Sequence, residues 1–399
     1  MQSYPPAMLY FDHNATTPVL PAARAAWLEA TEKFIGNPSS PHRLGQRADA
    51  ALQSARDQLA GLLGCDAMDI VWTSGATESS NMVLHHVACR APADAEVWVS
   101  AVEHPCVLAA ADLYFAKRTR RIPVSRAGVV DLEWLRDGLK KRKPALVAVM
   151  AANNETGVLQ PWRDVLAMCR EAKVPFLCDA AQWIGKLPAR GLGGCDFVSG
   201  CAHKFGGPKG VGFLKCPSAS RTTPLLVGGK QEDGRRAGTE NVASVLSMMA
   251  ALEVRERLLA AGEQQPRLAW REAFERKLLK RLPGSEIVGA GSERLWNTVS
   301  ALMPEADCQQ RWVVKLDKFG CAVSTGSACA SGREEPSHVL AAMGRTPGEA
   351  GRVLRFSSGW ETGANDWEAL LQGLLKAQAE VATAVKARKS KVQGPRSKE

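Results

Sequence analysis

The sequence contains no apolar run of the roughly 18 residues that a membrane-spanning helix requires. Its first residues, Met1 to Leu9, also lack the basic region and the following apolar stretch of a secretory signal peptide. We therefore expect a cytoplasmic location and no membrane partner.

The 11 cysteines show no disulfide or metal-binding pattern, because no C-x-x-C pair occurs. Many stand in apolar contexts such as Phe176-Leu177-Cys178. In a reducing compartment, most of them would be small buried side chains. We expect no disulfide framework and no metal site, so any reactive thiol has to be recognised from its neighbours.

The net charge of +10 is the feature that would favour nucleic-acid binding. Much of the positive charge lies in three segments, 117–121, 140–143 and 386–398. The last of these predicts a basic, disordered tail over residues 387–399. No nucleic-acid-binding motif is present, so we interpret the charge as a solvated surface and expect no nucleic-acid partner.

Strand-like and helix-like stretches alternate through the middle of the chain, which predicts an α/β domain with a largely parallel sheet. The predicted strands are 69–73, 96–100, 145–151, 176–178, 197–199 and 211–215, and the predicted helices include 77–89 and 161–172. A long charged helix over 253–282 is expected to lead into a second domain. That domain is expected to contain strands near 295–303 and 353–357 and a helix over 366–386.

Six polar residues come shortly after predicted strands: Thr77, His104, Asn154, Asp179, His203 and Lys204. Ligands of open α/β sheets bind beyond the carboxyl ends of the strands. We therefore expect these side chains to converge on one cleft.

The segment SGATES at residues 74–79 connects a predicted strand to a predicted helix. Its glycine permits a tight turn, and the free N–H groups of the helix start could bind a phosphate, with a further bond from the Thr77 hydroxyl. A plain helix cap is the alternative, since Ser and Thr are good N-cap residues.

Asp179 and Lys204 suggest a more specific chemistry. A carboxylate at the end of a buried strand needs a partner, which could be a protonated pyridine nitrogen or the N-terminus of the next helix. Lys204 lies in CAHKFGGPKG at residues 201–210, where a lysine before a glycine-rich turn can bind an aldehyde cofactor covalently. A surface lysine is the simpler alternative for Lys204 alone.

Several motifs resemble those of cysteine desulfurases, in the class V aminotransferase group, and the resemblance runs from Tyr10 to about Arg355. Besides the two segments above, the matching motifs are YFDHNATTP at 10–18, GNPSS at 36–40, ANNETG at 152–157, RRAGTEN at 235–241 and STGSAC at 324–329. The family implies the PLP-dependent transferase fold type I. This fold would comprise a large domain (17–262) with a mostly parallel seven-stranded sheet, and a smaller α+β domain (1–16 with 263–386).

The resemblance also implies a role for each site residue. Lys204 would bind pyridoxal 5'-phosphate covalently, Asp179 would pair with the ring nitrogen, and His104 would stack on the ring and transfer protons. The other cofactor contacts would be made by Ala76, Thr77, Asn154, Gln182, Cys201, His203 and Thr239. Thr239 would act across a homodimer interface, and Arg355 with Asn154 would bind the substrate carboxylate.

Cys329 has only small neighbours, Thr325 to Gly332, which predicts a mobile loop. An inert loop thiol is the alternative to a reactive one. The family implies that Cys329 takes sulfur from L-cysteine as a persulfide, that L-alanine is released, and that an acceptor protein receives the sulfur. Iron–sulfur cluster biogenesis is one possible destination.

Two departures from the family pattern stand out. Cys201 replaces a serine that usually binds the phosphate, and a thiol is a weaker donor. Trp296 replaces a usual proline, and Gly359-Trp360-Glu361-Thr362 is atypical. Selenocysteine lyase, another class V activity such as transamination, and a non-catalytic binding protein are the alternatives to a desulfurase.

Overall fold

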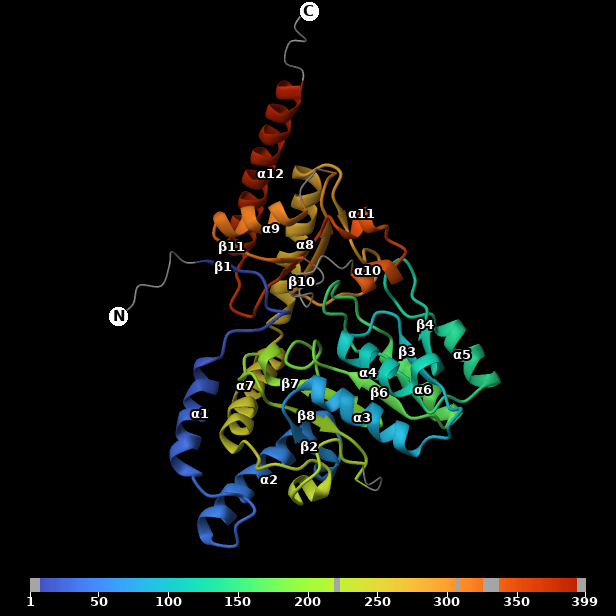
Figure 1. The fold of residues 1–399 in the computed structure, drawn as a ribbon. Helices are drawn as coiled ribbons and strands as arrows, with labels where there is room; N and C mark the ends of the chain where they lie inside the picture. Colours follow the sequence, from blue (N-terminus) through green and yellow to red (C-terminus); the bar gives the residue numbers. More distant parts are fainter. Residues whose placement is uncertain (1–7, 219–222, 306–308, 326–336, 393–399) are drawn as a thin grey trace, which may run out of the picture.

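The computed structural model describes residues 8–218, 223–305, 309–325 and 337–392. Within these residues, a large sheet with its helices forms one part of the molecule, and a smaller sheet with α8, α9 and α12 forms the other (Figure 1). None of the helices in the described ranges is long and apolar enough to cross a bilayer.

The large sheet has seven strands in the order β2-β8-β7-β6-β5-β3-β4. In that order they are Ile70–Thr73, Gly212–Lys215, Phe197–Cys201, Phe176–Asp179, Leu146–Ala148, Val97–Ser100 and Thr119–Ile122. Only β8 runs antiparallel to its neighbours in this sheet, and the remaining pairs are parallel. This confirms the predicted fold class.

Helices cover both faces of the large sheet, so all of its strands except the edge strand β4 are buried on both sides. In β6, Phe176 and Cys178 belong to one apolar cluster, whereas Leu177 belongs to another on the opposite face. This explains why the strands read as continuous apolar runs in the sequence. The helices of this part are α1 (Pro21–Lys33), α2 (Arg43–Leu63), α3 (Ala76–Arg90), α4 (Pro105–Phe115), α5 (Leu132–Lys141), α6 (Trp162–Ala172) and α7 (Val242–Ala260).

The second sheet is antiparallel and has the order β12-β13-β10-β9, with strands Ser324–Thr325, Val353–Ser357, Thr298–Leu302 and Glu286–Ile287. The N-terminal strand β1 (Leu9–Tyr10) pairs with β11 (Cys321–Ala322), which brings the start of the chain to this part. The helices here are α8 (Gln264–Arg281), α9 (Gln309–Lys318), α10 (His338–Ala342), α11 (Pro347–Ala350) and α12 (Ala364–Val392). A separate core, which includes Phe11, Phe274 and Trp367, supports it.

Two details differ from the sequence-based expectation. The predicted helix over 253–282 is two helices, because the chain turns between Ala260 and Gln264, and Gly262 there has φ +72. The last helix extends to Val392, beyond the predicted end at Lys386, because no glycine or proline occurs between Lys386 and Gly394. The boundaries of the two domains stay a prediction.

Candidate active site

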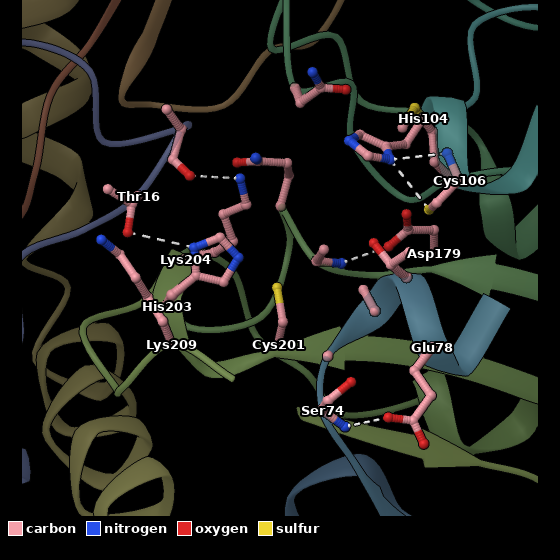
Figure 2. A pocket seen from close by; sticks show the side chains of 18 of the residues that line it. Thr16, Ser74, Glu78, His104, Cys106, Asp179, Cys201, His203, Lys204 and Lys209 are labelled. Carbon is pink, nitrogen blue, oxygen red and sulfur yellow. Dashed lines mark hydrogen bonds between the residues drawn. The ribbon is translucent and has the colours of Figure 1, made fainter. Parts of the chain in front are cut away.

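A cavity of about 500 Å³ lies at the carboxyl ends of the strands of the large sheet (Figure 2). All six polar residues that follow predicted strands line this cavity. Three further residues that the family resemblance implies as cofactor contacts line it too. The nine are Ala76, Thr77, His104, Asn154, Asp179, Gln182, Cys201, His203 and Lys204. They come from different strand ends and meet because those strands run parallel.

Lys204 ends a short 3-10 turn, Ala202–Lys204, that follows β7 directly. Its Nζ donates hydrogen bonds to the backbone carbonyls of Asn14 at 2.6 Å and Ala15 at 2.8 Å. The Thr17 hydroxyl in turn donates to the Lys204 carbonyl at 3.0 Å. The N-terminal motif YFDHNATTP therefore holds the lysine in the cavity.

Asp179 is the last residue of β6 and is only 5% exposed. Its Oδ1 accepts the backbone N–H of Ala181 at 2.9 Å. Within the described part of the chain, no basic side chain forms an ion pair with it. A buried carboxylate that lacks a cationic side chain fits the protonated nitrogen of a ligand ring.

The part of the cavity around the start of α3 can hold an anion. Helix α3 begins at Ala76, and its N-cap is Gly75, which contributes no side-chain cap bond. The plain side-chain cap considered for this segment is therefore absent, so N–H groups in the first turn of α3 can bind a ligand. His203 and Lys209 line the same cavity, across from Ser74 and Glu78 in the view of Figure 2. An amine, a buried carboxylate and an anion-binding helix end together suit an aldehyde cofactor with a basic ring and a phosphate.

His104 is the N-cap of α4, and its Nδ1 accepts the backbone N–H of Cys106 at 3.2 Å. Burial lowers the pKa of His104, with smaller contributions from Lys204 and His338, whereas Asp179 raises it. The ring is therefore favoured in its neutral form. Because Nδ1 is an acceptor, the proton of the neutral ring lies on Nε2.

Cys201 lines the cavity at the end of β7 and is 4% exposed. Its sulfur interacts with the backbone N–H of Ala76. Burial raises the pKa of this thiol to about 11. The thiol is therefore neutral at physiological pH and does not repel an anion.

Three nominated residues do not line the cavity. Arg355 lies on β13 and contacts the cavity lining, because its Nη1 donates a hydrogen bond to the carbonyl of the lining residue Asn154 at 3.1 Å. Thr239 is exposed and lies apart from the cavity lining. Cys329 lies outside the described residues.

Sequence reasoning overlooked two groups at the site. The Cys106 side chain lines the cavity, and its sulfur is 3.1 Å from Nδ1 of His104. Lys186 is 3% exposed and lies behind Gln182. A lysine inside the apolar stretch Trp183 to Leu187 is the sequence signal that points to a buried amine at Lys186.

Comparisons with known proteins agree with this geometry. Residues 9–370 match the family described as "Aminotransferase class-V". The chain is 40% identical to a "Cysteine desulfurase" of Klebsiella pneumoniae over 88% of its own length and 87% of that protein. It is also 40% identical to a "Cysteine desulfurase" of Frankia sp., over 89% of this chain and 87% of that one. The solved structure of a "NifS-like protein from Rickettsia africae" superposes with a TM-score of 0.84 at 30% identity, covering 93% of this chain and 99% of that chain.

Proposed function

The chain belongs to the class-V aminotransferase family, among the cysteine desulfurases, and we propose that it acts with pyridoxal 5'-phosphate on Lys204 and with Cys329 as the sulfur-accepting thiol. In this proposal, L-cysteine is converted to L-alanine and its sulfur becomes a persulfide on Cys329.

One observation carries the proposal more than any other. The Lys204 amine and the Asp179 carboxylate line one cavity, at the ends of the neighbouring strands β7 and β6. A covalent anchor for an aldehyde and a counter-charge for a pyridine ring are thereby available together. Few other ligands would need this pair in this setting.

Pyridoxal phosphate, when bound, supplies a carbonyl that links to amines and a ring that withdraws electrons. The chain's own residues have to hold that ring and move protons. Asp179 favours a protonated ring nitrogen, and the start of α3 with Thr77 and His203 binds the phosphate. Gln182, which follows the same strand as Asp179, and Asn154, which follows β5, line the same cavity and would contact the ring.

Lys204 would be the base for the Cα proton of the substrate, because its amine lies in the cavity and the carbonyls of Asn14 and Ala15 position it there. His104 is a neutral ring whose Nε2 can donate a proton. Arg355 binds the substrate carboxylate, which suits a guanidinium group. The thiolate of Cys329 then bonds to the substrate sulfur while the bond from that sulfur to Cβ breaks. The electron pair of the broken bond stays with Cβ, which takes up a proton, so that a persulfide and alanine result.

We also propose a homodimer, an acceptor protein and a cytoplasmic location. A homodimer is supported by Thr239, which is exposed and absent from the lining of the cavity that it would complete in a second subunit. An acceptor protein would receive the sulfur. A cytoplasmic location is supported by the nine cysteines of the described residues, all of which are free thiols.

Reduction with borohydride in the presence of pyridoxal phosphate tests the assignment, because it fixes the cofactor to the lysine that holds it. We expect the label on the Lys204 peptide in the wild-type protein. The Lys204→Ala variant should carry no label and release no alanine from cysteine. A matched variant, Lys209→Ala, removes the neighbouring lysine of the same cavity and should still carry the label on Lys204. A label on another lysine in the wild-type protein would contradict the proposal.

A further inference from the structure

Lys186 is a buried lysine to which the proposed mechanism gives no role. Its side chain is 3% exposed, and it lies behind the cavity rather than in its lining. The pKa of Lys186 lies well below its usual value because burial removes water from the amine, and because Lys204 and Arg355 are nearby cations. Burying an amine in this way is costly unless it makes specific hydrogen bonds.

The Lys186 amine makes two such bonds, and both lead toward Lys204. Its Nζ donates to Oδ1 of Asn14 at 2.9 Å and to Oε1 of Gln182. The backbone carbonyl of Asn14 accepts hydrogen bonds from Nζ of Lys204 at 2.6 Å and from Nε2 of Gln182 at 2.9 Å. The Lys186 amine therefore binds the side chain of Asn14, and the Lys204 amine binds the backbone carbonyl of the same residue.

Asn14 is itself fixed by the second sheet. It is 1% exposed, and its Nδ2 donates to the hydroxyl of Thr298 on β10 at 2.9 Å. Its backbone N–H donates to the hydroxyl of Ser357 on β13 at 3.0 Å. Its position between the two sheets is thus defined. Lys186 adds a donor to Oδ1 of the Asn14 side chain, which Asn297 also contacts at 3.2 Å, and a donor to the Gln182 amide.

Two tryptophans hold the backbone that carries Lys186. The indole N–H of Trp296 donates to the Lys186 carbonyl at 2.8 Å, and that of Trp360 donates to the Gly185 carbonyl at 2.9 Å. The two rings pack on each other with centroids 4.6 Å apart. These are the two tryptophans at which the chain departs from the family pattern, so both departures meet at the same backbone segment.

We propose that Lys186 is a positioning residue whose amine orients Gln182 and Asn14 so that both act on Lys204 and on the ring that Lys204 binds. The Trp296–Trp360 pair keeps Lys186 in place. This inference rests on the proposed function, since it concerns the same cavity. It adds a residue that touches neither substrate nor cofactor and acts through its two hydrogen bonds.

Two substitutions of Lys186 separate its hydrogen bonds from its bulk. Lys186→Met keeps the length of the side chain but removes the donor. We expect the dissociation constant for pyridoxal phosphate, measured by absorbance titration of the cofactor-free protein, to rise about tenfold, as the loss of one or two hydrogen bonds predicts. Lys186→Gln keeps an N–H donor without a charge and should restore most of that affinity.

Lys215→Met is the matched control, because Lys215 is another buried lysine, 5% exposed, on β8. Its amine donates to the carbonyl of Cys195 at 2.8 Å and pairs with Asp69 at 3.6 Å, away from the cavity lining. We expect this variant to lose stability with an unchanged cofactor affinity. In Lys186→Met, by contrast, kcat should fall about tenfold while KM for cysteine changes little, because the hydrogen bonds that are lost lead to Lys204.

The outcomes are distinct. A Lys186→Met variant that binds the cofactor as the wild type does would overturn the inference, as would equal losses in the Met and Gln variants. If Lys186→Met does not fold, Trp360→Phe decides, since it removes the hydrogen bond to Gly185 and reduces the packing on Trp296, which together hold the segment that carries Lys186. An unchanged cofactor affinity would then overturn the inference, and a weaker one would support it. Failure of the wild-type protein to bind the cofactor or to release alanine would instead contradict the proposed function.

Discussion

The guanidinium of Arg355 donates to the carboxylate of Asp12 at 2.7 Å, across 343 positions of the sequence. Its other terminal nitrogen donates to the carbonyl of Asn154, a residue of the cavity lining. Arg355 is 2% exposed, so these bonds define its orientation. The N-terminal motif thereby holds Lys204 through Asn14 and Arg355 through Asp12, and it sets the distance between the two groups proposed for cofactor and substrate.

Arg355→Lys is expected to raise KM for cysteine at least about tenfold, because an ammonium cannot reproduce a planar, two-pronged contact with a carboxylate. Binding of pyridoxal phosphate should change little, since Arg355 does not line the cavity. Steady-state alanine release over a range of cysteine concentrations measures this. Arg352→Lys, an arginine that binds the carbonyl of Met303 instead, is the control. An unchanged KM in Arg355→Lys would show that the substrate carboxylate binds elsewhere.

Cys201→Ser is expected to tighten binding of pyridoxal phosphate about three- to tenfold, because a hydroxyl is a stronger donor than a thiol toward a charged phosphate. The site needs little rearrangement, since Cys201 already lines the cavity beside Ala76. Equilibrium titration of the cofactor-free protein gives the two affinities. Cys216→Ser, at a buried cysteine after β8, should destabilise the fold without tightening the cofactor. Equal affinities of Cys201→Ser and wild type would place the phosphate away from residue 201.

His13 should make the protein sensitive to mild acid. Burial lowers its pKa from 6.5 to about 4, and its ring lies against the Cα of Gly359, where a Cβ would come within 2.3 Å. Between these two pH values the unfolded chain binds a proton that the folded protein does not. The free energy of unfolding therefore falls as the pH decreases from 6.5 toward 4, by up to about 3 kcal/mol.

Urea unfolding at several pH values across that window tests the contribution of His13. The His13→Gln variant lacks the titrating ring, so its unfolding free energy should depend less on pH than that of the wild type. His203, whose pKa burial also lowers to about 4, is present in both proteins and cancels in the comparison. Parallel pH profiles for the two proteins would mean that His13 is protonated equally in the folded and unfolded states.

Much of the fold and of the cavity could be predicted from the sequence. Apolar strands that end in single polar residues, such as Asp179 after Phe176 to Cys178, indicated both a buried parallel sheet and the edge at which a ligand binds. The family motifs added residues such as Gln182 and Cys201, which the structure places in the same cavity.

The remaining features depend on contacts between distant segments, which local patterns do not contain. The link from Arg355 to Asp12 and the two bonds of Lys186 exist only once both sheets are assembled. In the sequence, Trp296 and Trp360 are two separate departures from the family pattern. Their packing on each other is a property of the folded chain alone. The break between α7 and α8 depends on a positive φ at Gly262, and a charged helical pattern continues on both sides of it.

The most direct test of the account is the mass of the Cys329 peptide after the protein turns over cysteine in the absence of any sulfur acceptor. The account predicts one added sulfur on Cys329 in the wild-type protein, released by reductant, together with alanine. It predicts that Cys329→Ser still binds pyridoxal phosphate but forms no such adduct. An unmodified Cys329 peptide alongside full alanine and sulfide release, or a sulfur adduct on another cysteine such as Cys106, would contradict it.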